Sequence, residues 1–270
     1  MHKVITMCDN GYFQYGKLFI QTRKKIDADF ILYGPNLDSG QIHILTKNNI
    51  EYKKMDKRDF NLKMQYMKFK LLFDNITGAT EDNITFVDFD TLFLNDWNNY
   101  ISGKQFDLGI TYNNLFIKQK VYRSFANGGV IFVKDTFGSV NMCAYARHTM
   151  NIGNSKFLPE YDSIYKTLED HNRPEHKRYS RTYLRWWCDQ VFLSAIILQY
   201  LNTHSKLIMD DCAYKFHKHN IQFFDCSKFN NLNVTSENIT IRIMKHNPYI
   251  CHLKNIGRSG SYEKIIKRLL

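Results

Sequence analysis

The stretch that decides the fold runs Ile84-Thr85-Phe86-Val87-Asp88-Phe89-Asp90-Thr91-Leu92-Phe93-Leu94. Its first four residues predict a strand buried on both faces, because such strands are nearly continuous hydrophobic runs. Charged side chains are seldom buried without a partner, so Asp88 and Asp90 need a counter-charge. A divalent cation with oxygen ligands would supply it, and such ions often bridge carboxylates to phosphates. The stretch therefore predicts a metal site at the end of a buried strand, with a plain surface turn as the alternative.

Strands and helices alternate along the 270 residues, which predicts an α/β fold. Hydrophobic residues make up 44% of the chain and charged residues 23%, enough for one large core, so we expect a single domain over residues 1–270. The expected architecture is a central, mostly parallel sheet flanked by helices. The expected strands are residues 4–7, 30–33, 84–87, 106–110 and 130–133, and the expected helices are 12–25, 62–72 and 186–201.

The chain carries a formal net charge of +11, which attracts phosphates, nucleic acids and anionic membranes. Its six cysteines form no Cys-x-x-Cys pair, so we expect reduced, mostly buried thiols rather than a zinc site. The N-terminus does not resemble a secretory signal, and no apolar run approaches the roughly 20 residues that cross a bilayer. We therefore expect a cytoplasmic protein, either free or at the cytoplasmic membrane surface.

Residues 151–185 differ from the rest of the chain because they are polar and contain Pro159 and Pro174. We expect an irregular insertion or lid. Within it, residues 173–185 interleave arginines with Tyr179 and Tyr183, a pattern that also suits phosphates and stacked bases. This pattern supports a second hypothesis, a polyanion- or nucleic-acid-binding protein. At the C-terminus, residues 263–270 predict an amphipathic helix.

Two further motifs lie next to expected strands. Residues 6–16 combine a strand end, a tight turn and an aromatic residue, so Tyr12 suits stacking on a nucleotide base; packing of Tyr12 into the core is the alternative. Asn127 and two glycines precede the expected strand 130–133. Paired glycines let a backbone approach a ligand closely, and Asn127 suits sugar hydroxyls; an ordinary turn is the alternative.

Two later motifs carry polar groups suited to a sugar or a phosphate. Asp189 and Gln190 follow a pair of tryptophans, and we interpret them as residues that face a sugar. The alternative is that Asp189 is the N-cap or first-turn acid of a helix. His252 is followed by Lys254 and Arg258, a set suited to a metal ion and a diphosphate.

Taken in this order, the motifs resemble those of the GT-A glycosyltransferases of family 8, the group of glycogenin-like enzymes and bacterial galactosyltransferases. The resemblance covers Val4 to about Arg258. It rests on an opening Thr-x-x-Asp-x-x-Tyr-x-x-x-Gly, an Asp-x-Asp, an Asn before small residues, an Asp-Gln pair and a late His. In this chain these are Thr6, Asp9, Tyr12, Gly16, Asp88, Asp90, Asn127, Asp189, Gln190 and His252.

The resemblance implies a single GT-A domain with a Rossmann-like nucleotide half. It implies that a sugar moves from a nucleotide-diphosphate donor, most simply a UDP-sugar, to a hydroxyl of a glycan or another acceptor, with no specific nucleic-acid partner. Asp88, Asp90 and His252 would hold Mn2+ or Mg2+. The residues implied at the nucleotide sugar are Met7, Asp9, Tyr12, Lys70, Asp88, Phe89, Asp90, Asn127, Gly128, Lys254 and Arg258. The residues implied at the reaction centre are Asn127, Asp189 and Gln190.

The chain departs from the family pattern after His252, where Asn255 and Arg258 replace a glycine and a lysine. Arginine keeps the charge of lysine but changes the geometry of its contacts. We favour retention of the anomeric configuration, which needs no dedicated base. Inversion would need a carboxylate to deprotonate the acceptor, and Asp189 is the candidate. A metal-dependent nucleotidyltransferase or hydrolase that uses the same carboxylates is the third hypothesis.

Overall fold

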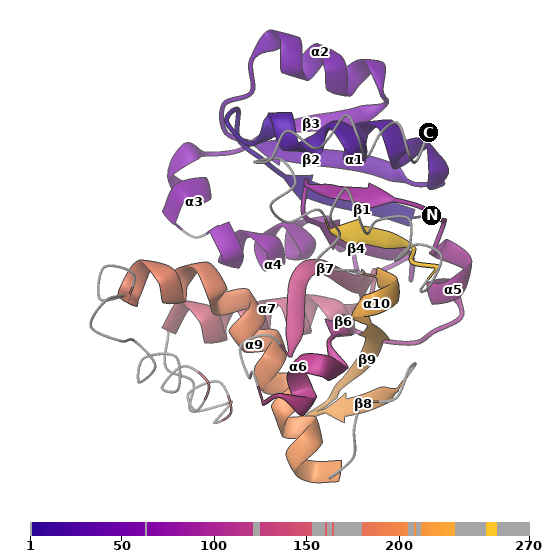
Figure 1. Cartoon of the computed structure of the whole chain (residues 1–270), viewed down its shortest axis with the longest axis vertical. Helices are drawn as coiled ribbons and strands as arrows, with labels where there is room; N and C mark the ends of the chain where they lie inside the picture. The colour runs from indigo at the N-terminus through magenta and orange to yellow at the C-terminus, as the bar shows by residue number, and fades with distance from the viewer. Residues whose placement is uncertain are drawn as a thin grey trace. The chain divides into compact units, whose positions relative to one another are not determined.

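The computed structural model describes residues 2–62, 64–120, 125–152, 160, 164, 180–204, 208, 212–229 and 247–252 (Figure 1). The chain divides into two compact units, each built from segments that are far apart in the sequence. The first unit comprises Met1–Lys57, Asp82–Lys104 and Cys226–Leu270, and the second comprises Arg58–Glu81 and Gln105–Asp225. Each unit combines strands with helices, so the fold belongs to the mixed α/β class that the sequence predicts.

The sheet of the first unit is parallel. Its strands are β1 (His2–Met7), β2 (Asp29–Gly34), β3 (Ile50–Lys54) and β4 (Asn83–Val87), in the order β3-β2-β1-β4. Val4 lies beside Phe30 and Ile5 lies beside Phe86. All residues of β4 are buried, as expected for a strand covered on both faces. The carboxyl ends of these strands share one edge, which is where ligands bind on parallel sheets.

An aromatic cluster holds the stretch 84–94 in the first unit. The ring of Phe19 contacts the rings of Phe30, Phe89 and Phe93, and Phe30 also contacts Phe93. The ring centroids in these pairs lie 5.0 to 5.8 Å apart. The short helices of this unit are η1 (Phe13–Gly16), α1 (Lys17–Thr22), η2 (Arg23–Lys25), α2 (Ser39–Lys47), α5 (Asn98–Ser102) and α10 (Cys226–Phe229).

A separate two-stranded ribbon continues this stretch. β5 (Thr91–Phe93) pairs antiparallel with β10 (Ile250–His252), and Thr91 lies opposite His252. The ribbon brings the late histidine of the sequence next to the two carboxylates that follow β4.

The sheet of the second unit is mixed. Its strands are β6 (Leu108–Tyr112), β7 (Ala126–Lys134), β8 (Ala213–Phe216) and β9 (His219–Asp225), in the order β7-β6-β9-β8. β6 runs parallel to β9 and antiparallel to β7, and β8 runs antiparallel to β9. The remaining helices are α3 (Lys57–Leu62), α4 (Met64–Asn75), α6 (Asn114–Lys118), α7 (Phe137–Ile152) and α9 (Ser180–His204). In this unit α4, α7 and α9 pack against one another, and α9 also packs on β7.

The structure confirms a mostly parallel sheet flanked by helices and corrects several boundaries. The expected helix 62–72 falls on the last residue of α3 and on α4. The expected insertion 151–185 is helical at both ends, because α7 extends to Ile152 and α9 begins at Ser180. Residues 180–204 contain neither glycine nor proline, so nothing local stops the helix from starting early.

Some expectations fall outside the described residues. They include most of the insertion 151–185 and the amphipathic helix at 263–270. No helix within the described ranges is both long enough and apolar enough to cross a bilayer. The six cysteines all lie within those ranges and form no disulfide. The single domain over residues 1–270 stays a prediction.

Candidate functional site

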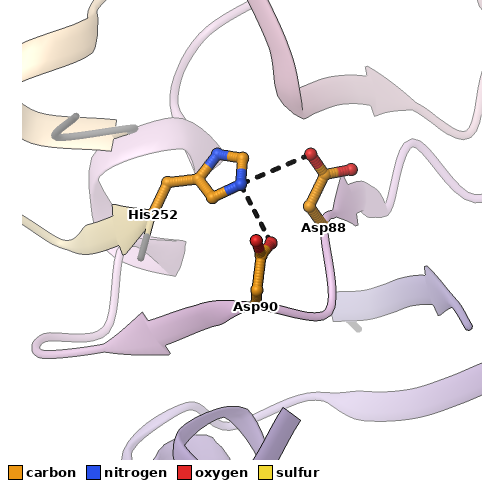
Figure 2. Close-up of side chains that lie close together, drawn as sticks. All are labelled: Asp88, Asp90 and His252. Carbon is orange, nitrogen blue, oxygen red and sulfur yellow. Dashed lines mark ion pairs between the residues drawn. The ribbon is translucent and has the colours of Figure 1, made fainter. Parts of the chain in front are cut away.

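Three ligand-type side chains converge in the first unit. Asp88 follows the end of β4, and Asp90 immediately precedes β5. The Thr91 hydroxyl donates a hydrogen bond of 2.9 Å to the carbonyl of Asp88, which tightens the turn between the two strands. His252 ends β10 directly opposite Thr91. The turn and the ribbon together place Asp88, Asp90 and His252 around one point, as Figure 2 shows.

The three side chains form a compact, largely buried group. His252 Nε2 lies 2.9 Å from Asp90 Oδ1 and 3.6 Å from Asp88 Oδ2 (Figure 2). One ligand atom from each residue falls within 4.8 Å of the others. The side chain of His252 is 2% exposed and that of Asp90 11%, whereas that of Asp88 is 27% exposed. The group is thus buried on the histidine side and reaches solvent at Asp88.

The charge of Asp90 is stabilised by its neighbours. Burial alone would raise the pKa of this carboxyl, but the electrostatic attraction and the hydrogen bond of His252, together with a hydrogen bond from Tyr12, outweigh burial. The pKa of Asp90 therefore lies well below its ordinary value. The Tyr12 hydroxyl donates to Asp90 Oδ2 over 2.7 Å. Asp90 is consequently a carboxylate at neutral pH, the form that binds a cation.

The turn after β1 positions Tyr12. The backbone N–H of Tyr12 donates to Asp9 Oδ1 over 2.7 Å. Gln41 Nε2 donates to Asn10 Oδ1 over 2.8 Å, which ties the turn to the start of α2. Tyr12 is 40% exposed, so its alternative interpretation as a core residue is wrong. Met7 is buried at the end of β1, one residue before the turn.

Phe89 lies between the two carboxylates, and its side chain points into the core. Its ring contacts Phe13 and Phe19 at centroid distances of 5.7 and 5.1 Å. A Cβ atom at Gly16 would lie 2.0 Å from this ring, so only glycine fits there. Phe89 as a whole is 1% exposed, and the contact with a nucleotide sugar that we predicted for it stays a prediction.

A second group of predicted site residues lies in the second unit, in an irregular part of β7. Ile110 pairs with Ile131 and Tyr112 with Ala126, so the segment 127–130 bulges opposite the single residue Thr111. The Thr111 hydroxyl donates to the carbonyl of Asn127 over 2.9 Å. The expected order, with the Asn-Gly-Gly motif before its strand, is therefore wrong, because the motif is a bulge inside β7.

Asn127 is buried and partly satisfied. Its Oδ1 accepts a hydrogen bond of 2.9 Å from the N–H of Gly129. Its Nδ2 has no hydrogen-bond partner among the residues that the structure describes, although the residue is only 3% exposed. Buried amide groups are normally paired, so an orphaned Nδ2 is the kind of group that a ligand completes.

Asp189 lies in the middle of α9 and faces β7. The helix begins at Ser180, so the interpretation of Asp189 as an N-cap or first-turn acid is wrong. Its Oδ2 lies 3.1 Å from Lys68 Nζ, and its Oδ1 accepts a hydrogen bond from the N–H of Gln190. Lys68 Nζ also donates to the carbonyl of Gly128 over 2.9 Å. Lys68 therefore joins α4, α9 and the bulge of β7.

Gln190 fastens the same helix to the start of β7. Its Nε2 donates to the carbonyl of Ala126 over 3.2 Å, and Ser194 Oγ accepts from the N–H of Ala126 over 3.1 Å. The structure thus brings together four predicted residues in the second unit, namely Asn127, Gly128, Asp189 and Gln190.

Solved structures share this fold. The galactosyltransferase LgtC, in a complex with donor and acceptor sugar analogs, aligns with a TM-score of 0.53 and 11% identity over 99% of this chain and 94% of LgtC. The chain has the GT-A glycosyltransferase fold. An active-site mutant of LgtC aligns with a TM-score of 0.52 and 10% identity, over 99% of this chain and 94% of that chain. The bifunctional glycosyltransferase WbbM aligns with a TM-score of 0.55 and 10% identity, over 99% of this chain but 49% of WbbM.

No protein-family model and no curated protein matches the sequence of the chain. At these identities, the likeness to the GT-A enzymes is one of fold. The sites therefore have to be argued from the residues of this chain.

Lys68 was not among the predicted site residues, whereas Lys70, two positions later on α4, was predicted and stays a prediction. Lys70 forms an ion pair with Asp74 one turn along α4, and both side chains are partly exposed. Lys68 is instead 5% exposed and shares a helical face with the buried residues Leu71, Leu72 and Asn75. Lys68 begins a face with the i, i+3, i+4 and i+7 spacing of a buried helix side, and a lysine on such a face needs a buried counter-charge. This spacing can be recognised in the sequence. Lys254, Asn255 and Arg258 lie outside the described residues.

The group in the first unit fits a hard divalent cation. Two carboxylates and one imidazole nitrogen are ligands that Mn2+ accepts, and carboxylates also suit Mg2+. Octahedral Mg2+ bonds of about 2.1 Å put ligand atoms roughly 3 to 4 Å apart, close to the separations in this group. Asp88 is the most exposed of the three side chains, so the group is accessible from solvent on that side.

Proposed function

We propose that the protein is a metal-dependent glycosyltransferase that moves a sugar from a nucleotide-diphosphate donor, a UDP-sugar in its simplest form, to a hydroxyl of a glycan acceptor. The observation that carries the proposal is the convergence of Asp88, Asp90 and His252 on one point in a chain with the GT-A fold. LgtC, which shares this fold, was solved with donor and acceptor sugar analogs. The motif order adds the finer proposal of a family 8-like enzyme.

Asp88, Asp90 and His252 would hold Mn2+ or Mg2+. When bound, the ion supplies Lewis-acid stabilisation of the negative charge that develops on the leaving diphosphate. Asp90 stays ionised at neutral pH because of its neighbours, and a diphosphate is proposed to approach on the side of the partly exposed Asp88. Met7, Asp9 and Tyr12 are proposed to bind the nucleoside. Lys70, Lys254 and Arg258 are proposed to approach the diphosphate or the donor sugar.

Asn127, Gly128, Asp189 and Gln190 are proposed to contact the sugar. The orphaned Nδ2 of Asn127 suits a sugar hydroxyl as acceptor. Both oxygens of Asp189 are engaged, one by Lys68 and the other by the N–H of Gln190. A carboxylate held in this way is better suited to orienting a substrate than to accepting a proton. This arrangement supports retention of the anomeric configuration over inversion with Asp189 as base.

A donor-hydrolysis assay tests the proposal. The protein is incubated with UDP-galactose, UDP-glucose and UDP-N-acetylglucosamine in turn, and the release of UDP is followed with Mn2+ and with EDTA. We expect release from at least one donor in Mn2+ and none in EDTA, with Asp90→Ala inactive in both. Turnover that is unaffected by EDTA would contradict a metal-dependent transferase. The acceptor is then sought with the donor that reacts.

A further inference from the structure

Tyr12 is the residue that links the turn after β1 to the candidate metal group. Its hydroxyl donates to Asp90 Oδ2 over 2.7 Å, while its side chain is still 40% exposed. A base-stacking role uses the face of the ring and makes no use of the hydroxyl. The contact with Asp90 therefore needs an explanation of its own.

The two oxygens of Asp90 have different partners. Oδ2 accepts from the Tyr12 hydroxyl, and Oδ1 lies 2.9 Å from His252 Nε2. Since the side chain of Asp90 is only 11% exposed, water has little access to replace either contact. The hydroxyl therefore fixes the rotation of the carboxylate and leaves Oδ1 as the oxygen that faces His252.

The position of the hydroxyl is itself fixed. Asp9 Oδ1 accepts from the backbone N–H of Tyr12, and the ring packs edge-on against Tyr15 at a centroid distance of 5.0 Å. The backbone of Tyr12 thus has a defined place before the side chain reaches Asp90. A short hydrogen bond from a phenol to a carboxylate, made in a partly buried place, is among the stronger neutral-to-charged contacts.

We propose that the Tyr12 hydroxyl is a positioning group for the metal ligand Asp90, in addition to the nucleoside contact proposed for the ring. The inference rests on the proposed function, because it assumes that Asp90 binds a divalent cation. Partners that orient a metal ligand typically account for about 10- to 100-fold in metal affinity. The ring of Tyr12 would then contact the nucleoside, while its hydroxyl would orient Asp90 toward the metal ion.

The test measures Mn2+ binding to the nucleotide-free protein by electron paramagnetic resonance. Tyr12→Phe removes the hydroxyl and keeps the ring, and Tyr15→Phe makes the same chemical change on the neighbouring ring. We expect the Mn2+ dissociation constant to rise about 10-fold in Tyr12→Phe and to stay unchanged in Tyr15→Phe. Circular dichroism and a thermal melt in EDTA check that each variant is folded. The UDP affinity at saturating Mn2+ is measured in parallel and should fall less in Tyr12→Phe than in Tyr12→Ala.

An equal or tighter Mn2+ affinity in Tyr12→Phe would overturn the inference while leaving the proposed function standing, provided that the wild-type protein binds Mn2+ and UDP. A wild-type protein that binds no Mn2+ with or without UDP would overturn both. An equal loss in Tyr15→Phe would also overturn the inference, because the effect would then be a general one of the turn.

Discussion

The ammonium group of Lys68 lies 3.1 Å from Asp189 Oδ2, and both side chains are buried. The same ammonium donates to the carbonyl of Gly128. One lysine on α4 thereby fixes two of the residues proposed to contact the sugar. Because the pair is buried, loss of one of its charges destabilises the protein more than loss of one charge from a surface pair does.

Removal of Lys68 is expected to destabilise the protein strongly. Lys68→Met removes one partner of the buried ion pair that Lys68 forms with Asp189, and breaking a buried ion pair in this way typically costs about 3 kcal/mol or more. Urea unfolding at neutral pH measures the change in the free energy of unfolding. Lys70→Met is the matched control, because Lys70 lies two residues after Lys68 on the same helix and forms a partly exposed pair with Asp74. Loss of this pair should lower the free energy of unfolding by less than about 0.5 kcal/mol. Equal effects of the two substitutions would contradict a buried pair at Lys68.

A side chain at position 128 is expected to disturb Asp189. A Cβ atom there would lie 2.2 Å from Asp189 Oδ2 and 2.9 Å from its Cγ, far too close for any contact. Gly128→Ala should therefore push the carboxylate away from Lys68 and destabilise the protein by about 1–3 kcal/mol, the usual cost of overpacking. Gly103→Ala serves as control, since a Cβ atom there would meet no atom of the described residues within 4 Å. A Gly128→Ala protein as stable as the control would show that Asp189 is mobile.

Asp135 is expected to make stability depend on pH. Its carboxylate accepts hydrogen bonds from the N–H groups of Thr77 and Gly78 and from the hydroxyls of Thr77 and Thr80. Burial would raise the pKa of Asp135, but these four bonds outweigh it and hold the pKa below its ordinary value. The unfolded chain then binds a proton at a higher pH than the folded protein does. The stabilisation is complete above the unfolded pKa of about 3.9 and is lost as the pH falls through the lower folded pKa.

Asp135→Asn tests this directly. The substitution should cost about 2 kcal/mol at pH 7, because it removes bonds to a charged acceptor and turns an amide donor toward groups that also donate. The difference in the free energy of unfolding between the two proteins should shrink when urea unfolding is repeated at pH 3.5 and below. A difference that stays constant from pH 7 to pH 3 would mean that the charge of Asp135 contributes nothing.

The local patterns of the sequence predicted most of the fold and part of the candidate site. The buried run 84–87 followed by Asp88 and Asp90 sufficed to predict a strand and two of the three side chains of the candidate metal group, because strand burial and charge burial are local requirements. His252 joined them through the resemblance, and only the pairing of β5 with β10 explains its proximity. The bulge at Asn127 and the role of Lys68 were not predicted, because they depend on registers and partners distant in the sequence.

The thermal stability of the protein with UDP, in Mn2+ and in EDTA, tests the central claim most directly. A ligand that binds only the folded state raises the melting temperature, so the shift reports binding without knowledge of the sugar. We predict a clear rise with UDP in Mn2+ and none with UDP in EDTA. For Asp90→Ala, the melting temperature with UDP is compared with that of the same variant without UDP. The Mn2+-dependent rise should be absent in this variant. A UDP shift of the same size in EDTA, or no UDP shift in Mn2+, would contradict the account.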